Sequence, residues 1–204
     1  MKILGVNYQK ELEKIIANNE KEGVKPTLLL QVCCAPCSSY CLEYLHEYFN
    51  ITVLFYNPNI YPESEYAARE SELLRLIDEL GFNDINIMKT TFNPDEFYTA
   101  VKGFEDCKEG GDRCKICYRL RLEKTAELAK SGGFDYFCTT LSISPLKSAE
   151  ALCTIGLELE KEYGVKYLLS DFKKKEGYKR SIELSREYNL YRQDYCGCVF
   201  SKNN

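Results

Sequence analysis

The sequence predicts a single Rossmann-like α/β domain, in which a mainly parallel sheet carries helices on both faces. Short apolar runs alternate with segments of helical periodicity along the whole chain, and this alternation is typical of parallel strands joined by helices. No internal repeat or flexible linker interrupts it, and 204 residues, 45% of them hydrophobic, are enough for one core. We expect a helical extension over residues 1–25 and a cysteine-containing tail over residues 189–204 that packs on the rim of the site.

The first half of the chain carries three predicted strands. Compact apolar or β-branched runs at 27–32, 51–56 and 85–88 are typical of buried parallel strands. Helices are expected over 8–19, from the cysteine motif to about Tyr48, from Pro62 and from Pro94. A polar loop from 105 to 113 closes this half.

The second half continues the alternation. A helix over 114–130 should end before Gly132, where a glycine can adopt the backbone conformation that stops a helix. Strands are expected at 136–141 and 165–169, and helices from Pro145 and over 177–188.

Polar and thiol side chains follow several predicted strands. In open parallel sheets, ligands bind beyond the carboxyl ends of the strands. We therefore expect one binding rim that contains Cys33, Cys34, Asn57, the segment 139–144 and Asp171.

Cysteine is the unusual residue of this sequence, with 11 copies against one histidine. The odd number, together with the lack of a signal peptide or an apolar membrane segment, predicts a cytoplasmic protein with reduced thiols rather than a disulfide framework. Three groups stand out: Cys33, Cys34 and Cys37; Cys114 and Cys117; Cys196 and Cys198.

These groups favour metal or redox chemistry. Thiolates at the start of a helix are stabilised by its positive end. Cys33, Cys34, Cys114 and Cys117 together offer four soft ligands, which suit zinc or an iron–sulfur cluster. The Cys196-Gly197-Cys198 segment could chelate a metal or form a strained, easily reduced disulfide. Asp171 could ligate a metal, act as an acid or cap a helix.

The overall charge argues against general binding of polyanions. The formal net charge is −4, so a nucleic-acid substrate would need a local basic face. The late run with Lys173, Lys174, Lys175, Lys179 and Arg180 could supply one, or it could be the solvated start of a helix.

Several motifs resemble one known family. They are the apolar run 28–30 followed by the cysteine motif 33–38, and the motifs at 56–60, 113–122, 139–145, 170–172 and 190–198. In this order they resemble the corrinoid-independent epoxyqueuosine reductases of the QueH family. The resemblance covers nearly the whole chain from about residue 25.

The resemblance implies a fold, a reaction and cofactors. Such proteins reduce epoxyqueuosine at the wobble position of tRNA to queuosine, the last step of queuosine synthesis, with an external electron donor. They are iron–sulfur proteins, with a 4Fe-4S cluster expected and a second metal, a mononuclear iron, beside it. Their fold is of the nucleotide-hydrolase-like (HUP) type.

Roles for individual residues follow as predictions. We assign metal binding to Cys33, Cys34, Cys114 and Cys117, with Asp171 as a ligand of the mononuclear iron or a catalytic group. Cys37, Cys196 and Cys198 are further ligands or a dithiol relay. Contacts with the tRNA are assigned to Arg113, Arg119 and Arg192, although Arg119 could instead form a salt bridge on its helix.

Two alternatives stay open. The first is an RNA-binding module that a structural zinc ion stabilises and that has no catalytic activity of its own. The second is an ATP-using tRNA-modifying enzyme on the same fold, which the lack of a glycine-rich phosphate loop after the first strand disfavours.

Overall fold

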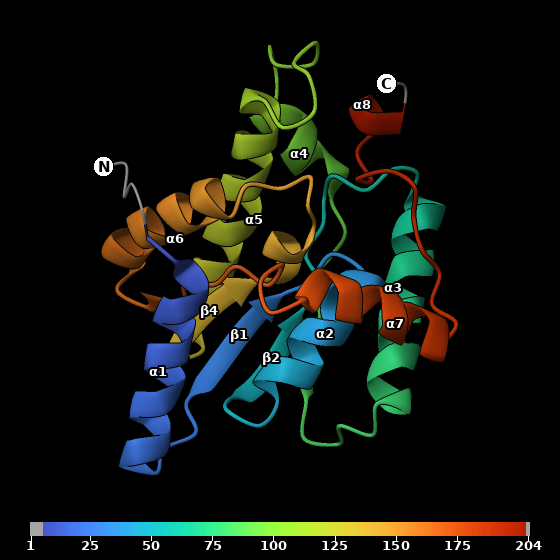
Figure 1. Cartoon of the computed structure of the whole chain (residues 1–204). Helices are drawn as coiled ribbons and strands as arrows, with labels where there is room; N and C mark the ends of the chain where they lie inside the picture. Colours follow the sequence, from blue (N-terminus) through green and yellow to red (C-terminus); the bar gives the residue numbers. More distant parts are fainter. Residues whose placement is uncertain (1–5, 203–204) are drawn as a thin grey trace.

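A computed structural model describes residues 6–202 and contains one five-stranded parallel sheet (Figure 1). The strands are β1 (Thr27–Gln31), β2 (Asn50–Leu54), β3 (Asn86–Met88), β4 (Tyr136–Thr139) and β5 (Lys166–Tyr167). Their order is β3-β2-β1-β4-β5, and Leu30 of β1 lies opposite Val53 of β2 and Cys138 of β4. The predicted α/β fold class is confirmed.

Helices cover both faces of the sheet. They are α1 (Tyr8–Glu22), α2 (Ala35–Leu45), α3 (Glu63–Glu79), α4 (Pro94–Ala100), α5 (Asp112–Ser131), α6 (Ala149–Tyr163), α7 (Gly177–Glu187) and α8 (Val199–Lys202), with a 3₁₀ turn, η1, at Thr140–Ile143. In Figure 1, α2, α3 and α7 lie on one side of the strands, and α5 and α6 lie on the other.

The two largest parts of the core lie on the two faces of the sheet, because side chains along a strand point alternately to the two faces. Leu28 and Leu30 pack with Leu42 of α2 in one part. Leu29 packs with Leu122 of α5 in the other. All of these side chains are fully buried, and each burial stabilises the fold by about 1.5–3 kcal/mol.

From the fourth strand onward, three predicted boundaries of strands and helices were wrong. The strand predicted over 136–141 ends at Thr139, because the Thr139 side chain accepts a hydrogen bond from the Leu141 N–H and starts η1. The helix predicted from Pro145 begins at Ala149, where the preceding Ser148 caps it. The strand predicted over 165–169 is reduced to the two residues of β5.

The two ends of the chain pack onto the domain. Helix α1 places Leu12 and Ile16 in the core beside β1. The tail runs along α3, where the Tyr191 N–H donates to Glu72 and the Tyr195 hydroxyl donates to the Tyr61 carbonyl. Residues 1–5 of the predicted extension and 203–204 of the predicted tail lie outside the described residues.

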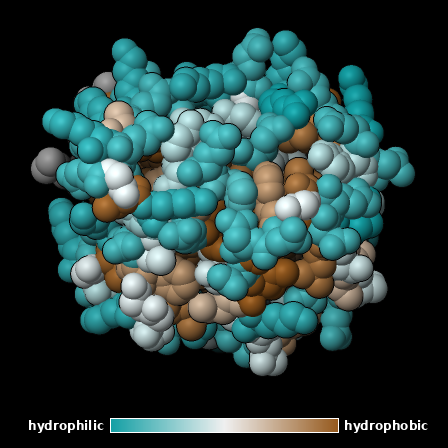
Figure 2. Space-filling model, turned by 90° about the horizontal axis from the view of Figure 1, so that it is seen from below, coloured by the Kyte–Doolittle hydropathy of each residue, from teal (hydrophilic) through white to brown (hydrophobic). Residues whose placement is uncertain are grey.

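The cysteine motif lies at the opposite end of the sheet from the face shown in Figure 2. That face carries hydrophilic side chains around a central region where hydrophobic residues reach the surface (Figure 2). Within residues 6–202, no helix combines the length and the apolar character needed to cross a membrane.

Candidate metal centre

The cysteine motif lies where the connections of two neighbouring strands diverge. From β1 the chain enters α2 on one face, and from β4 it enters η1 and then α6. The Cys33 Sγ lies 4.0 Å from the Thr140 Oγ1, so the segments after β1 and β4 meet, as predicted. This position is where open α/β sheets bind ligands.

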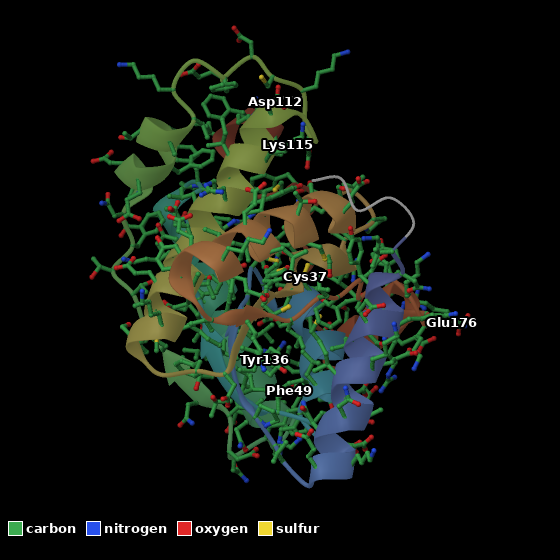
Figure 3. The ribbon with its side chains drawn as sticks, turned by 90° about the vertical axis from the view of Figure 1, so that its left-hand side faces the viewer. Cys37, Phe49, Asp112, Lys115, Tyr136 and Glu176 are labelled. Carbon is green, nitrogen blue, oxygen red and sulfur yellow. The ribbon has the colours of Figure 1, made fainter. Side chains whose placement is uncertain are left out.

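The first cysteine group is Cys33, Cys34 and Cys37, whose sulfur atoms all lie within 4.8 Å of one another. Cys37 lies within the body of the molecule, below the end that carries Asp112 and Lys115 (Figure 3). The Cys33 and Cys34 sulfur atoms lie 3.7 Å apart, and the neighbouring thiols of Cys34 and Cys37 hold the pKa of Cys33 well below its usual value. The proximity of Cys33 in turn raises the pKa of Cys34 and of Cys37, so the group favours one negative charge.

The second cysteine group is Cys114 and Cys117, in the first turns of α5. The Gly110 N–H donates to the Cys114 Sγ over 3.2 Å. Burial raises the pKa of the Cys117 thiol to about 11, and nearby Cys196 and Cys198 contribute to this. The second group and the tail pair therefore share one neighbourhood.

A cavity of about 300 Å³ joins the first cysteine group to the tail. Its lining includes all three thiols of that group and the half-buried Cys196. Leu146, which is 72% exposed, and Tyr178 stand where the cavity opens to the surface.

Three cations that the sequence predictions missed line the same cavity: Arg69 and Arg121 are buried, and Lys147 is half-buried. Arg121 donates to the Asn57 Oδ1 at 3.3 Å and to the Cys117 carbonyl at 3.4 Å. Burial lowers the pKa of Arg121, but the thiols of Cys117, Cys196 and Cys33 raise it by more. Because residue 121 follows Cys117 by one helical turn, its spacing could have revealed it.

Lys147 and Arg69 complete this set. The Lys147 Nζ donates to the Cys196 Sγ over 3.2 Å. Arg69 is 2% exposed, pairs with Glu65 at 2.7 Å and donates to the Cys196 carbonyl at 3.3 Å. No sequence signal marked either residue, because each reaches the cavity from a distant element.

These residues fit an anionic metal–thiolate group. Within residues 6–202, neither Arg121 nor Lys147 has a carboxylate at ion-pair distance, and the Arg121 Nη2 is buried without a hydrogen-bond partner. A buried cation without a counter-charge costs several kcal/mol. Thiolates that hold a metal would supply that counter-charge and use ligands that suit iron and zinc.

Of two other predicted site residues, Asp171 lies away from the cavity and Arg192 lies at it. Asp171 does not line the cavity; its carboxylate lies 3.0 Å from the Lys173 Nζ, and α7 begins too late for Asp171 to cap it. Its predicted metal or acid role stays a prediction. Arg192 does line the cavity and donates to the Ser185 Oγ at 3.0 Å.

Two predicted RNA contacts are not supported by the geometry. Arg113 is 2% exposed and donates to the carbonyls of Glu105 and Cys107, so it holds the loop before α5 rather than facing a ligand. Arg119 pairs with Glu158 and Glu162 of α6 at 3.2 and 3.1 Å, which is the salt-bridge alternative.

The predicted basic face is largely paired with acids. Lys175 lies 2.7 Å from Glu13, Lys179 lies 3.4 Å from Glu176, and Arg180 lies 2.6 Å from Glu43. Lys173 likewise lies 3.0 Å from Asp171, so among the described residues only Lys174 of the five lacks a carboxylate partner. This result favours the solvated helix start.

Comparisons of the sequence identify relatives over nearly the whole chain. The family model described as "Epoxyqueuosine reductase QueH" matches residues 28–204. A protein of that name from Streptococcus pyogenes serotype M1 is 44% identical over 96% of this chain and 78% of its own length. One from Staphylococcus epidermidis is 42% identical over 98% and 87%, and one from Thermotoga maritima is 39% identical over 86% and 90%.

Comparisons of the structure find the same fold at low sequence identity. The U34-tRNA thiolase NcsA from Methanococcus maripaludis, solved with its [4Fe-4S] cluster, superposes with a TM-score of 0.56 at 14% identity, covering 95% of this chain and 67% of that one. The NMN synthetase of Francisella tularensis gives 0.50 at 12%, covering 93% and 75%. These likenesses concern the fold alone.

Proposed function

This chain belongs to the epoxyqueuosine reductase QueH family, and from that premise we propose that it reduces epoxyqueuosine in tRNA to queuosine. The reaction converts an epoxide, two electrons and two protons into an alkene and water. The single observation that carries the proposal is the cavity where thiols of the first cysteine group lie beside the buried Arg121 and the half-buried Lys147, neither of which has a carboxylate partner within residues 6–202. Because the substrate is a tRNA, we place the enzyme in the cytoplasm.

The cofactor we propose is an iron–sulfur cluster with a second metal beside it. We assign the cluster to Cys33, Cys34, Cys114 and Cys117, and Cys37 to the second metal. When bound, such a cofactor supplies electrons and a Lewis acid for the epoxide oxygen.

The cations of the cavity serve the charged states of this reaction. Arg121 faces the thiols of Cys33 and Cys117 from within the core, so its charge offsets that of metal-bound thiolates. The Lys147 ammonium lines the cavity, where its charge would stabilise negative charge on the departing oxygen.

The size of the cavity limits what can enter. About 300 Å³ is near the lower bound of small-molecule sites and suits one modified nucleobase rather than a stretch of RNA. We propose that Leu146 and Tyr178 contact the base at the opening and that Arg192 contacts the adjoining backbone.

The test is a reductase assay under strictly anaerobic conditions. Iron-loaded protein is incubated with tRNA that carries epoxyqueuosine and with a chemical reductant, and the nucleosides are analysed by mass spectrometry. We expect conversion to queuosine by the iron-loaded protein, and none by protein stripped with a chelator or reconstituted with zinc.

Two results would overturn the proposal. An iron-loaded protein that binds the tRNA but leaves the epoxide intact would favour the RNA-binding module. Conversion that proceeds equally well with the zinc-loaded protein would remove the redox cofactor from the account.

A further inference from the structure

We propose that Asn57 is a positioning residue for the metal centre: it holds the Arg121 guanidinium beside the thiols with a neutral acceptor and so leaves the full positive charge of Arg121 facing the cofactor. The inference rests on the proposed function, which supplies an anionic cofactor in this cavity. It adds to that function a residue that tunes the reduction potential of the cofactor through Arg121.

Arg121 is a buried cation whose partners within residues 6–202 are neutral. It is 2% exposed, and it donates to the Asn57 Oδ1 at 3.3 Å and to the Cys117 carbonyl at 3.4 Å. A buried arginine usually pairs with an acid, because burial of an uncompensated charge is costly. A carboxylate at position 57 would remove this cost, whereas the amide of Asn57 leaves the charge of Arg121 uncancelled.

The uncancelled charge lies among the cysteine groups. The Arg121 Nη2 is buried and has no hydrogen-bond partner among the described residues, and the side chain lines the cavity. Burial acts to lower the pKa of this guanidinium, but the thiols of Cys117, Cys196 and Cys33 raise it above its usual value. The cation therefore faces thiols of all three cysteine groups, where it stabilises negative charge on sulfur.

A chain of hydrogen bonds across the sheet fixes the orientation of Gln31. The Leu141 N–H donates to the Thr139 Oγ1 at 3.2 Å, and the Thr139 hydroxyl donates to the Gln31 Oε1 at 2.6 Å. Gln31 and Thr139 are register partners at the ends of β1 and β4, and both are fully buried. With its oxygen held by Thr139, Gln31 turns its NH2 group to the Asn57 Oδ1, which lies 3.1 Å away.

Asn57 is held at both ends of its amide. Its Nδ2 donates to the Val32 carbonyl at 2.8 Å, and its Oδ1 accepts from both Gln31 and Arg121. The side chain is 1% exposed, so water does not compete for these bonds. The amide cannot turn over without losing all three bonds, and Asn57 therefore presents an oxygen to the guanidinium.

The charge of Arg121 bears on the redox chemistry of the site. Reduction of a metal–thiolate cofactor by one electron adds one negative charge to it, and a nearby cation favours the more negative form. This effect is larger in the low dielectric of the core than in water. By keeping the cation uncancelled, Asn57 raises the reduction potential of the cofactor.

The test measures the reduction potential of the iron-loaded protein by visible absorbance during an anaerobic titration with a chemical reductant, without tRNA. Asn57→Asp keeps the size of the side chain and places a carboxylate beside Arg121. It should favour the oxidised form about ten-fold, a fall in potential of about 59 mV for one electron. It should also make the release of iron to a chelator about ten-fold faster. The matched control is Asn59→Asp: Asn59 is also buried, and its Oδ1 has no hydrogen-bond partner among the described residues, so this variant should keep the wild-type potential.

Further variants show whether Asn57 acts through Arg121. In Arg121→Met protein, Asn57→Asp should add little to the change in potential, because a buried carboxylate without a cation stays protonated. Gln31→Leu, which removes the donor to Asn57, should favour the oxidised form about three-fold, and Gln31→His, which keeps a donor and an acceptor, should restore the wild-type potential. A merely structural role would lower the stability of these variants without moving the potential.

The proposal is overturned if Asn57→Asp keeps the wild-type potential, if Asn59→Asp lowers the potential as much, or if the fall persists in full in the Arg121→Met background. Should Asn57→Asp not fold, a wild-type potential in Gln31→Leu overturns it. Failure of the tRNA assay while these shifts are present would overturn the proposed function alone, because the titration needs neither tRNA nor turnover.

Discussion

Replacing Gly197 by alanine should release the tail from the cavity. A residue other than glycine at a φ of +111° carries backbone strain of about 1–3 kcal/mol. The added Cβ would also lie 2.9 Å from the Arg69 Nη1 and 3.2 Å from the Ile60 Cγ1. Arg69 is buried and paired with Glu65, so it cannot move away freely, and the overpacking adds about 1–3 kcal/mol.

The sum, about 2–6 kcal/mol, is enough to undock a segment held mainly by a few hydrogen bonds. Hydrogen exchange measured by mass spectrometry should show lost protection over residues 190–198, and Cys198 should become open to alkylation. The matched control is Gly103→Ala, where φ is +87° and no atom lies within 4 Å of the added Cβ. That control carries the strain without the clash. Full protection of the tail in Gly197→Ala would show that the conformation of Gly197 does not hold the tail at the cavity.

Three further predictions address the metal centre and the RNA. Cys114→Ala and Cys117→Ala should each abolish iron incorporation, whereas the control Cys153→Ala, which removes a buried thiol from α6, should keep it. Equal iron content in all three variants would show that Cys114 and Cys117 are not ligands. Arg121→Met removes an uncompensated buried charge, so it should make the metal-free protein more stable by about 1–4 kcal/mol and should lower the iron content of the loaded protein. A metal-free variant that is less stable in chemical denaturation would contradict this. Binding of tRNA, measured by filter retention, should weaken as the salt concentration rises, and it should fall more in Arg192→Ala than in Lys179→Ala, because Lys179 is already paired with Glu176. A larger loss in Lys179→Ala would indicate that the RNA binds away from the cavity.

The sequence was sufficient to predict the fold and the position of the cysteine motif. Apolar runs such as 27–32 are continuous because parallel strands are buried on both faces, so their pattern is visible locally. The motif at Cys33 follows such a run, and its place at the rim depends only on the general topology of parallel sheets.

The cationic lining could not be predicted because it depends on packing between distant elements. Arg69 reaches the tail from α3, and Lys147 reaches it from the segment before α6. The partners of Arg113 could not be predicted for the same reason: they are backbone carbonyls of the preceding loop, which no residue pattern reveals. Asp171 follows a strand in sequence, but Lys173 neutralises it away from the cavity.

The iron and acid-labile sulfide content of protein purified without oxygen shows directly whether the chain holds an iron–sulfur cluster. We expect a brown protein with about four sulfides and at least about four irons per chain, as a 4Fe-4S cluster requires. Cys33→Ala should lose both iron and sulfide, because the first cysteine group is needed to hold the cluster. A colourless protein that holds one zinc and no sulfide, with the cysteine groups intact, would rule out the proposed cluster.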